Sequence, residues 1–162
     1  MTVRPATWVD AEAVAKIWID RWRDAHLGHV PDELLAVRTE ESFGVRASQR
    51  VDDTTVATVN GVVAGFVMVV GDEVEQVYVS KEHRGTSVAT ILLAEAERLV
   101  VSNGHRKAWL AVVAGNPRAR RFYERNDWTD EGTFEYAAST ASGSVIVPTH
   151  RYTKELLGRT SL

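Results

Sequence analysis

The sequence of 162 residues predicts one domain, residues 1–162, of the α/β (α+β) class, built on a mixed sheet. Three observations predict this fold class. β-branched runs form a meander over residues 54–79, a helical period replaces them over residues 87–103, and an apolar strand follows over residues 108–113. Because strand, helix and strand in this order form a crossover unit, the strands on either side of the helix should be parallel neighbours.

The N-terminal part predicts a short strand and then helices. A helix is expected from about Ala11, with Asp10 as its N-cap. The apolar residues that recur on it at helical spacing are Val14, Ile17, Trp18 and Trp22. A second, broken helical region follows residue 31, and Thr39 is placed to cap its continuation.

The meander contains two tight turns. Asn60-Gly61 joins strands expected over residues 54–59 and 62–70, because Asn and Gly tolerate the positive φ that a type I′ turn needs. Gly71-Asp72 leads into the third strand, residues 73–79. Three consecutive antiparallel strands are therefore predicted.

The C-terminal part alternates strand and helix before it ends in a hairpin. The helix over residues 87–103 should stop at Gly104. Asn116-Pro117 is a cap followed by proline at the first helical position, and this starts a helix ending near Asn126. The last two strands are expected over residues 128–138 and 145–156.

Composition argues against several classes of protein. Hydrophobic residues make up 44% and charged residues 25%, as in an ordinary globular fold. The chain has no cysteine, which removes disulfides, a thiolate nucleophile and cysteine-ligated zinc. A net charge of −3 argues against non-specific binding to nucleic acid. No signal-peptide run and no stretch of roughly 20 apolar residues is found, so a cytoplasmic location away from membranes is expected.

The segment between the third meander strand and the long helix has the features of a phosphate site. The free N–H groups and the positive dipole end of a helix start attract anions. Gly85 lets the backbone approach a ligand closely, and the planar guanidinium of Arg84 suits phosphate. Thr86 and Ser87 add hydroxyls. The same residues also suit a solvated helix cap with a surface arginine, so they leave both interpretations open.

These residues resemble the pyrophosphate motif of the GNAT superfamily of acetyl-CoA-dependent N-acetyltransferases. That motif has Arg or Gln, two residues, Gly, one residue and then Gly or Ala, followed by an apolar helix. The run Arg84-Gly85-Thr86-Ser87-Val88-Ala89 matches it, except that Ser87 stands where the family usually has Gly. Because a residue in the first turn of a helix has negative φ, serine need not be strained there.

A second stretch, residues 116–128, resembles the family's Asn-x-x-Ala-x-x-Phe-Tyr-x-x-x-Gly-Phe helix. The matching positions are Asn116, Ala119, Phe122 and Tyr123. Asp127-Trp128 replaces Gly-Phe, which affects a turn rather than the proposed chemistry. A predicted strand lies between the two motifs, and the element order over nearly the whole chain also resembles this fold.

The resemblance implies a mostly antiparallel sheet of six to seven strands, with a splayed central parallel pair and helices on both faces. The pantetheine arm of acetyl-CoA would lie between the splayed strands, residues 73–79 and 108–113. The Val79 N–H would donate to the thioester carbonyl and to the oxyanion that develops there. The residues expected to bind the cofactor are Val77, Tyr78, Val79, Arg84, Gly85, Thr86, Ser87, Val88, Ala89, Thr90, Asn116, Arg120 and Tyr123.

The reaction that the resemblance implies is direct attack of an amine on the thioester. An amine with a pKa near 10.4 is mostly charged at neutral pH, so a carboxylate or a water chain must take its proton. Glu73 and Glu75 are two residues apart on one strand, and hence on one face. Either is a candidate base, and either would also suit a solvent-facing position. Tyr123 matches the family's tyrosine that protonates the departing thiolate, which makes it the candidate acid.

The resemblance places the acceptor pocket beneath the first two helices and the last hairpin. Aromatic residues there favour a small acceptor, although large apolar residues on a helix more often belong to the core. The candidate substrate-binding residues are Trp18, Trp22, His26, Phe43 and Tyr136. His26 and His29 are three residues apart, but Gly28 interrupts the helix between them and no acidic third ligand is obvious, so no metal is expected.

The leading hypothesis is an acetyl-CoA-dependent N-acetyltransferase that acts on a small-molecule amine, with no nucleic-acid or membrane partner. A homodimer is the family's default. Two alternatives stay open: acetylation of a protein N-terminus or lysine, and a CoA-binding sensor without transfer activity. An open groove would favour a protein substrate, and Ser87 is the sequence feature that suggests the sensor.

Overall fold

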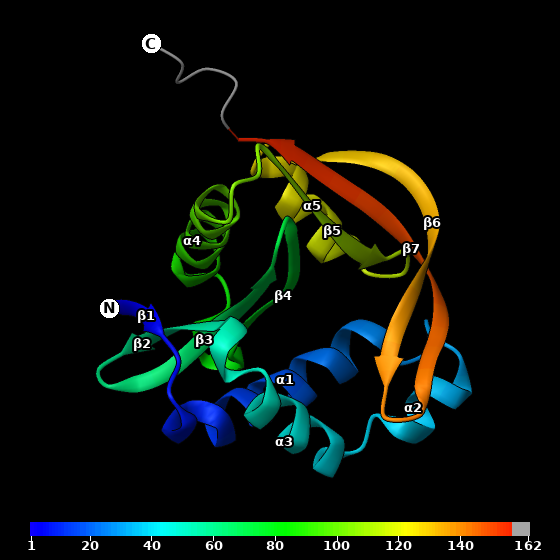
Figure 1. Cartoon of the computed structure of the whole chain (residues 1–162), viewed down its shortest axis with the longest axis horizontal. Helices are drawn as coiled ribbons and strands as arrows, with labels where there is room; N and C mark the ends of the chain where they lie inside the picture. The colour runs from blue at the N-terminus through cyan, green and yellow to red at the C-terminus, as the bar shows by residue number, and fades with distance from the viewer. Residues whose placement is uncertain (157–162) are drawn as a thin grey trace.

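The computed structural model describes residues 1–156, in which a seven-stranded sheet carries helices on both faces (Figure 1). The strands are β1 (Thr2–Pro5), β2 (Thr54–Val59), β3 (Val62–Val70), β4 (Glu73–Val79), β5 (Lys107–Val113), β6 (Thr129–Thr140) and β7 (Gly143–Glu155). The helices are α1 (Ala11–His26), α2 (Asp32–Val37), α3 (Glu40–Gln49), α4 (Val88–Ser102) and α5 (Pro117–Arg125). Short 3-10 turns are η1 (Trp8–Asp10), η2 (Val51–Asp53) and η3 (Lys81–His83).

The strand order in the sheet is β1-β2-β3-β4-β5-β7-β6, and every neighbouring pair is antiparallel except β4 and β5. In the first turn of the meander, Asn60 and Gly61 have φ angles of 53° and 79°. This is the left-handed geometry that the Asn-Gly pair predicts. The crossover through α4 makes β4 and β5 parallel, as the sequence analysis predicts.

Two hydrophobic clusters fill the space on the two sides of the sheet, because the side chains of β3 alternate between its faces. Phe66 and Met68 pack in the cluster that includes α1 and α3. Val67 and Val69 pack in the cluster that includes α4 and α5. β2 and β3 are therefore buried on both faces, which explains their continuous apolar character.

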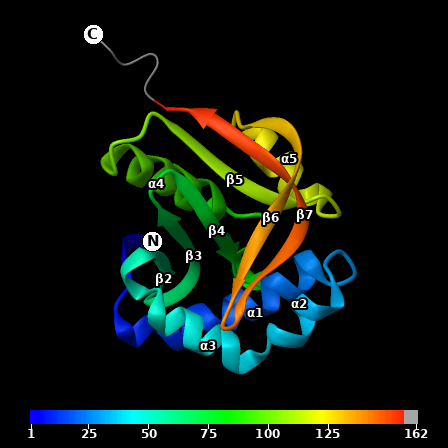
Figure 2. The same cartoon turned by 45° about the vertical axis from the view of Figure 1, so that its right-hand side comes forward.

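The parallel pair is held together at one end only. β4 and β5 share a single register pair, Glu73 with Trp109, and the Trp109 N–H donates to the Asp72 carbonyl at 3.0 Å. Beyond this pair the two strands separate, as Figures 1 and 2 show from two directions. β7 pairs with all of β5, so the sheet continues on the far side of the opening.

Two local predictions differ from the structure in detail. Asp10 is the N-cap residue of α1 as predicted, but it makes no side-chain hydrogen bond there, because its carboxylate accepts hydrogen bonds from the Thr7 N–H and from Arg4, both at 2.8 Å. Its helical φ of −80° keeps the side chain from the first amides of α1. The last hairpin is also longer than predicted, because only Ala141 and Ser142 remain between β6 and β7.

The cap predicted for the second helical region is confirmed. The Thr39 hydroxyl accepts the Ser42 N–H at 3.1 Å, and α3 begins at the next residue. Within residues 1–156, no helix combines the length and the hydrophobicity needed to cross a membrane. The last part of the predicted domain, residues 157–162, lies outside the described residues.

Candidate active site

Two backbone amides of β4 face the opening between β4 and β5. The Ser80 N–H donates to the Ala64 carbonyl at 2.8 Å, and antiparallel partners alternate between bonded and non-bonded pairs. Val79 and Val77 therefore occupy non-bonded positions opposite β3, and their N–H groups point away from it. No strand pairs with them on the other side, because β5 has already diverged.

A bulge in β4 decides which amides face the opening. The register shifts so that Met68 lies opposite Gln76 and Val69 opposite Val74, which leaves Glu75 as the extra residue. The Asp72 carbonyl faces β5, so in a regular strand the even-numbered residues would face β5 throughout. The extra residue reverses this alternation and directs residues 77 and 79 toward the opening.

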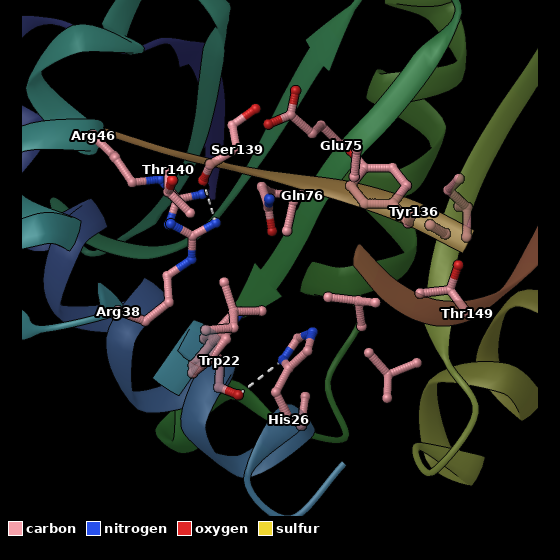
Figure 3. A pocket seen from close by; sticks show the side chains of 18 of the residues that line it. Trp22, His26, Arg38, Arg46, Glu75, Gln76, Tyr136, Ser139, Thr140 and Thr149 are labelled. Atoms are coloured by element: carbon pink, nitrogen blue, oxygen red, sulfur yellow. Dashed lines mark hydrogen bonds between the residues drawn. The ribbon is translucent and has the colours of Figure 1, made fainter. Parts of the chain in front are cut away.

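The opening leads into a cavity of about 1180 Å³. Its walls come from α1, from the segment spanning α2 and α3, from β4 and β5, from α5 and from the β6–β7 hairpin (Figure 3). His29 contacts the backbone of Gly115 so closely that a Cβ there would overlap the imidazole ring. The loop after α1 and the loop after β5 therefore pack directly on each other beside the cavity.

Both candidate bases line this cavity, but their partners differ. The Tyr136 hydroxyl donates to Glu73 Oε2 at 2.6 Å. Burial raises the pKa of Glu73, and the hydrogen bond from Tyr136 opposes this in part. Glu75 instead forms two hydrogen bonds with Arg50, at 2.7 and 3.1 Å. Among residues 1–156 Glu73 forms no ion pair, whereas the Glu75 carboxylate is held by Arg50.

Tyr123 lies on α5 and also lines the cavity. Its ring is buried against Phe122 and Trp128, with centroid distances of 5.2 and 6.1 Å. Within residues 1–156 its hydroxyl has no hydrogen-bond partner, and burial raises its pKa. The phenol is therefore protonated at neutral pH and free to donate. Asn116 caps the same helix, since its Oδ1 accepts the Ala119 N–H at 3.2 Å.

The loop before α4 has the free donors expected of an anion site. Gly85 has a φ of 80°, and a Cβ added there would meet nothing within 4 Å. Ser87 has a φ of −76°, so the serine in place of the family's glycine is not strained. Within residues 1–156 the N–H groups of Ser87, Ala89 and Thr90 have no acceptor. These donors and the exposed Arg84 fit a pyrophosphate.

The other predicted cofactor residues lie in different surroundings. Val77, Tyr78, Asn116 and Tyr123 line the cavity, whereas residues 84–90 lie outside it. Arg120 also lies outside. Its guanidinium donates to the Tyr152 hydroxyl and to Asp130, both at 3.2 Å, and is therefore held against β6 and β7.

The structure divides the five candidate acceptor residues into two groups. Trp22, His26 and Tyr136 line the cavity. Trp18 and Phe43 do not, because they are fully buried in the core with their rings 5.4 Å apart. These two belong to the apolar stripes that attach α1 and α3 to the sheet, so the prediction that they contact the acceptor is corrected.

His26 is held in a defined orientation. Its ring stacks on Trp22 at 4.7 Å, and its Nδ1 lies 2.9 Å from the Trp22 carbonyl oxygen, which makes Nδ1 the donor. Burial is the main cause that lowers the pKa of His26 to about 4. The imidazole is therefore neutral at physiological pH. Within residues 1–156 no group of three or more metal-binding side chains is found.

Sequence reasoning missed the arginines of the cavity. Arg38, Arg46 and Arg50 all line it, from α3 and from the residues that flank this helix. Arg46 and Arg50 are four residues apart, which indicates a shared helical face. That spacing was the only available signal, and it does not distinguish a face toward a cavity from a face toward solvent.

Comparison with known families identifies the class of protein. Residues 11–128, well over half of the chain, match the model of the acetyltransferase (GNAT) family. The chain therefore belongs to the GNAT family. It is an acyltransferase, and its acetyl donor is acetyl-CoA. A comparison with curated proteins finds no match.

Solved structures share the fold over nearly the whole chain. A GCN5-related N-acetyltransferase from Rhodopseudomonas palustris is 23% identical, with a TM-score of 0.72 and coverage of 96% of this chain and 95% of that one. Ribosomal-protein-alanine N-acetyltransferase from Brucella melitensis is 20% identical, with a TM-score of 0.71 and coverage of 96% and 100%. PaiA N-acetyltransferase from Thermoplasma acidophilum, in complex with coenzyme A, is 16% identical, with a TM-score of 0.70 and coverage of 95% and 98%. These likenesses show the fold.

Proposed function

We propose that this protein transfers the acetyl group of acetyl-CoA to the primary amine of a small molecule, by direct attack of the amine on the thioester. One observation carries the proposal. The unpaired amides of Val77 and Val79, the carboxylate of Glu73 and the unpartnered hydroxyl of Tyr123 converge on the opening between β4 and β5 and on the cavity behind it. Such convergence of donors, a base and an acid is what amide formation from a thioester requires.

The chain's own donors account for binding of the acetyl donor. The free amides at the start of α4, together with Arg84, would hold the pyrophosphate. The amides of Val77 and Val79 would hold the pantetheine arm in the opening, since no other strand uses them. Bound in this way, acetyl-CoA would supply the thioester, whose carbonyl carbon is the electrophile.

Two side chains would transfer protons, and one backbone amide would stabilise the charge that develops between them. Glu73 accepts a proton from the incoming ammonium, and its raised pKa makes it a better acceptor than an ordinary carboxylate. The Val79 N–H donates to the thioester oxygen as that atom gains negative charge. The C–N bond forms as the C–S bond breaks, and Tyr123 donates its proton to the leaving thiolate and regains a proton from the substituted nitrogen, which becomes the neutral amide. The pKa of Tyr123 is raised, but a thiolate in the same buried place is also destabilised, which favours the transfer.

The shape of the cavity supports a small acceptor. Its volume of about 1180 Å³ is slightly above the range of ordinary small-ligand pockets, and it must hold both the acetyl end of the donor and the acceptor. The β6–β7 hairpin, with Tyr136, covers one side, and Trp22 and His26 cover another (Figure 3). A cytoplasmic location and a homodimer stay predictions from the sequence.

Thermal unfolding and free-thiol release test the proposal. Acetyl-CoA at 100 times its dissociation constant should stabilise the fold by about 2.7 kcal/mol, a rise of several degrees in Tm for a chain of this size. In a panel of small amines and peptides, free thiol should then be released only in the presence of a compound that is acetylated.

The Tyr123→Phe variant tests the assignment of the acid. It should lower kcat by about 10²- to 10⁴-fold with little change in the affinity for acetyl-CoA. Tyr152→Phe is the matched control, because the Tyr152 hydroxyl, which donates to Glu124 and accepts from Arg120, lies outside the cavity. Unchanged turnover in Tyr123→Phe would remove Tyr123 as the acid. Stabilisation by acetyl-CoA without acetylation of any amine would favour a sensor.

A further inference from the structure

Two arginines in the cavity wall lack the partners that buried guanidinium groups normally have. Arg38 is only 7% exposed, and its single hydrogen bond within residues 1–156 runs from Nη2 to the Ser139 carbonyl at 2.6 Å. Its Nε is buried without an acceptor. Neither Arg38 nor Arg46 forms an ion pair with any residue in 1–156.

Arg46 is held in a similar position by aromatic rings. Its guanidinium carbon lies 4.2 Å from the ring centroid of Trp18 and 5.4 Å from that of Phe43. Its Nη1 is buried without an acceptor, and burial lowers its pKa to about 10. Arg38 is close enough to contribute to that lowering, and Figure 3 shows the two side chains converging beside Ser139.

Two cations without a counter-charge in the wall of a cavity are costly unless a ligand supplies the negative charge. Glu75 is the acidic side chain whose charge acts on both, and Arg50 already binds both of its oxygens. We propose that the acetyl acceptor carries an oxyanionic group, a carboxylate or a phosphate, that binds Arg38 and Arg46 in this cavity. This inference rests on the proposed function and names the class of its substrate: an amine that is also an acid.

The position of the two arginines suits a small bifunctional molecule. Both arginines interact electrostatically with the Tyr78 side chain, so both lie near it. Tyr78 stands between Val77 and Val79, the two residues whose amides face the opening. The donor's phosphates have their own predicted site at the start of α4, which does not line the cavity. The oxyanion site is therefore available to the acceptor, whose amine end would reach Glu73.

Matched pairs of acceptors test this inference on the wild-type protein. One arm compares amino acids with their amides, and the other compares aminoalkyl phosphates with the corresponding amino alcohols. A charge-assisted pair of hydrogen bonds should raise kcat/KM about 10- to 100-fold for the acidic member. Preference in the first arm identifies a carboxylate, and preference in the second a phosphate. Equal kcat/KM within every pair would overturn the inference.

Two variants locate the effect. Arg38→Gln and Arg46→Gln should each reduce the acid-to-neutral ratio of kcat/KM by about tenfold or more. Because the ratio is taken on one preparation, any loss of folded protein cancels. Arg98→Gln, which removes an exposed arginine of α4, is the matched control and should leave the ratio unchanged. A ratio unaffected by both cavity variants would also overturn the inference.

A binding measurement separates this inference from the proposed function. Thermal unfolding in saturating CoA is compared for the same matched pairs. Acids that raise Tm more than their neutral partners, without being acetylated, would support the oxyanion site and contradict the transferase proposal. Equal acetylation of the acidic and the neutral member of every pair would support the transferase proposal and contradict the oxyanion site.

Discussion

The hydrogen bond from Tyr136 to Glu73 provides a direct test of which carboxylate is the base. The hydroxyl donates at 2.6 Å, and Glu73 has no cationic partner within residues 1–156. The bond stabilises the ionised carboxylate and lowers its pKa, against the larger effect of burial, which raises it. Tyr136→Phe removes this stabilisation but keeps the ring, so the pKa of Glu73 should rise further.

The size of the effect follows from the geometry. A hydrogen bond to a charged group is worth about 1.5–3 kcal/mol, and one pKa unit corresponds to about 1.36 kcal/mol. Both partners are only half-buried, so the lower end applies, and the acid limb of kcat/KM should move up by about one pH unit. The sign follows because Glu73 must be deprotonated to act, and activity is lost as pH falls through its pKa.

The assay is kcat/KM for the best acceptor between about pH 5 and 9, measured by thiol release. Tyr152→Phe is the matched control, because it removes a buried tyrosine hydroxyl outside the cavity. Glu73→Gln should abolish the acid limb of this pH profile. If Tyr136→Phe retains turnover and its acid limb of kcat/KM does not move, Glu73 is not the base, and Glu75 becomes the candidate.

Three further predictions concern stability. Asp127 has a φ of 69°, so Asp127→Gly should raise the free energy of unfolding by about 0.5–1 kcal/mol, seen as a higher Tm; a lower Tm would contradict this. Gly65→Ala should lower the free energy of unfolding by about 1–3 kcal/mol, because the new Cβ would meet the Tyr78 carbonyl oxygen at 2.7 Å. The control Gly44→Ala, in open space on α3, should leave this free energy unchanged or raise it. His26 has a folded pKa of about 4 against about 6.5 unfolded, so stability present above pH 6.5 should be lost progressively toward pH 4, by up to roughly 3 kcal/mol. Denaturant titrations of wild type and His26→Gln measure this, and equal pH slopes would contradict it.

Much of the fold could be predicted from the sequence because its signals are local. Asn60-Gly61 favours positive φ through the local properties of these two residues, and the structure has positive φ at both. The change from period 2 to period 3.6 after β4 predicts the crossover and hence the parallel pair, which the structure has. Asp10 shows the limit of local signals. Its carboxylate accepts hydrogen bonds from Arg4 and Thr7 instead of from the first amides of α1.

The sequence by itself determined the family motifs and the order of the elements, since both depend on near neighbours along the chain. Only the tertiary structure decided which side chains share the cavity. Trp18 and Trp22 are one helical turn apart and belong to the same buried cluster, yet only Trp22 also lines the cavity. Likewise Arg38 meets Ser139, 101 residues away, through packing that no local period records. Which charges stay unpaired depends on these long-range contacts, and so does the chemistry of the acceptor.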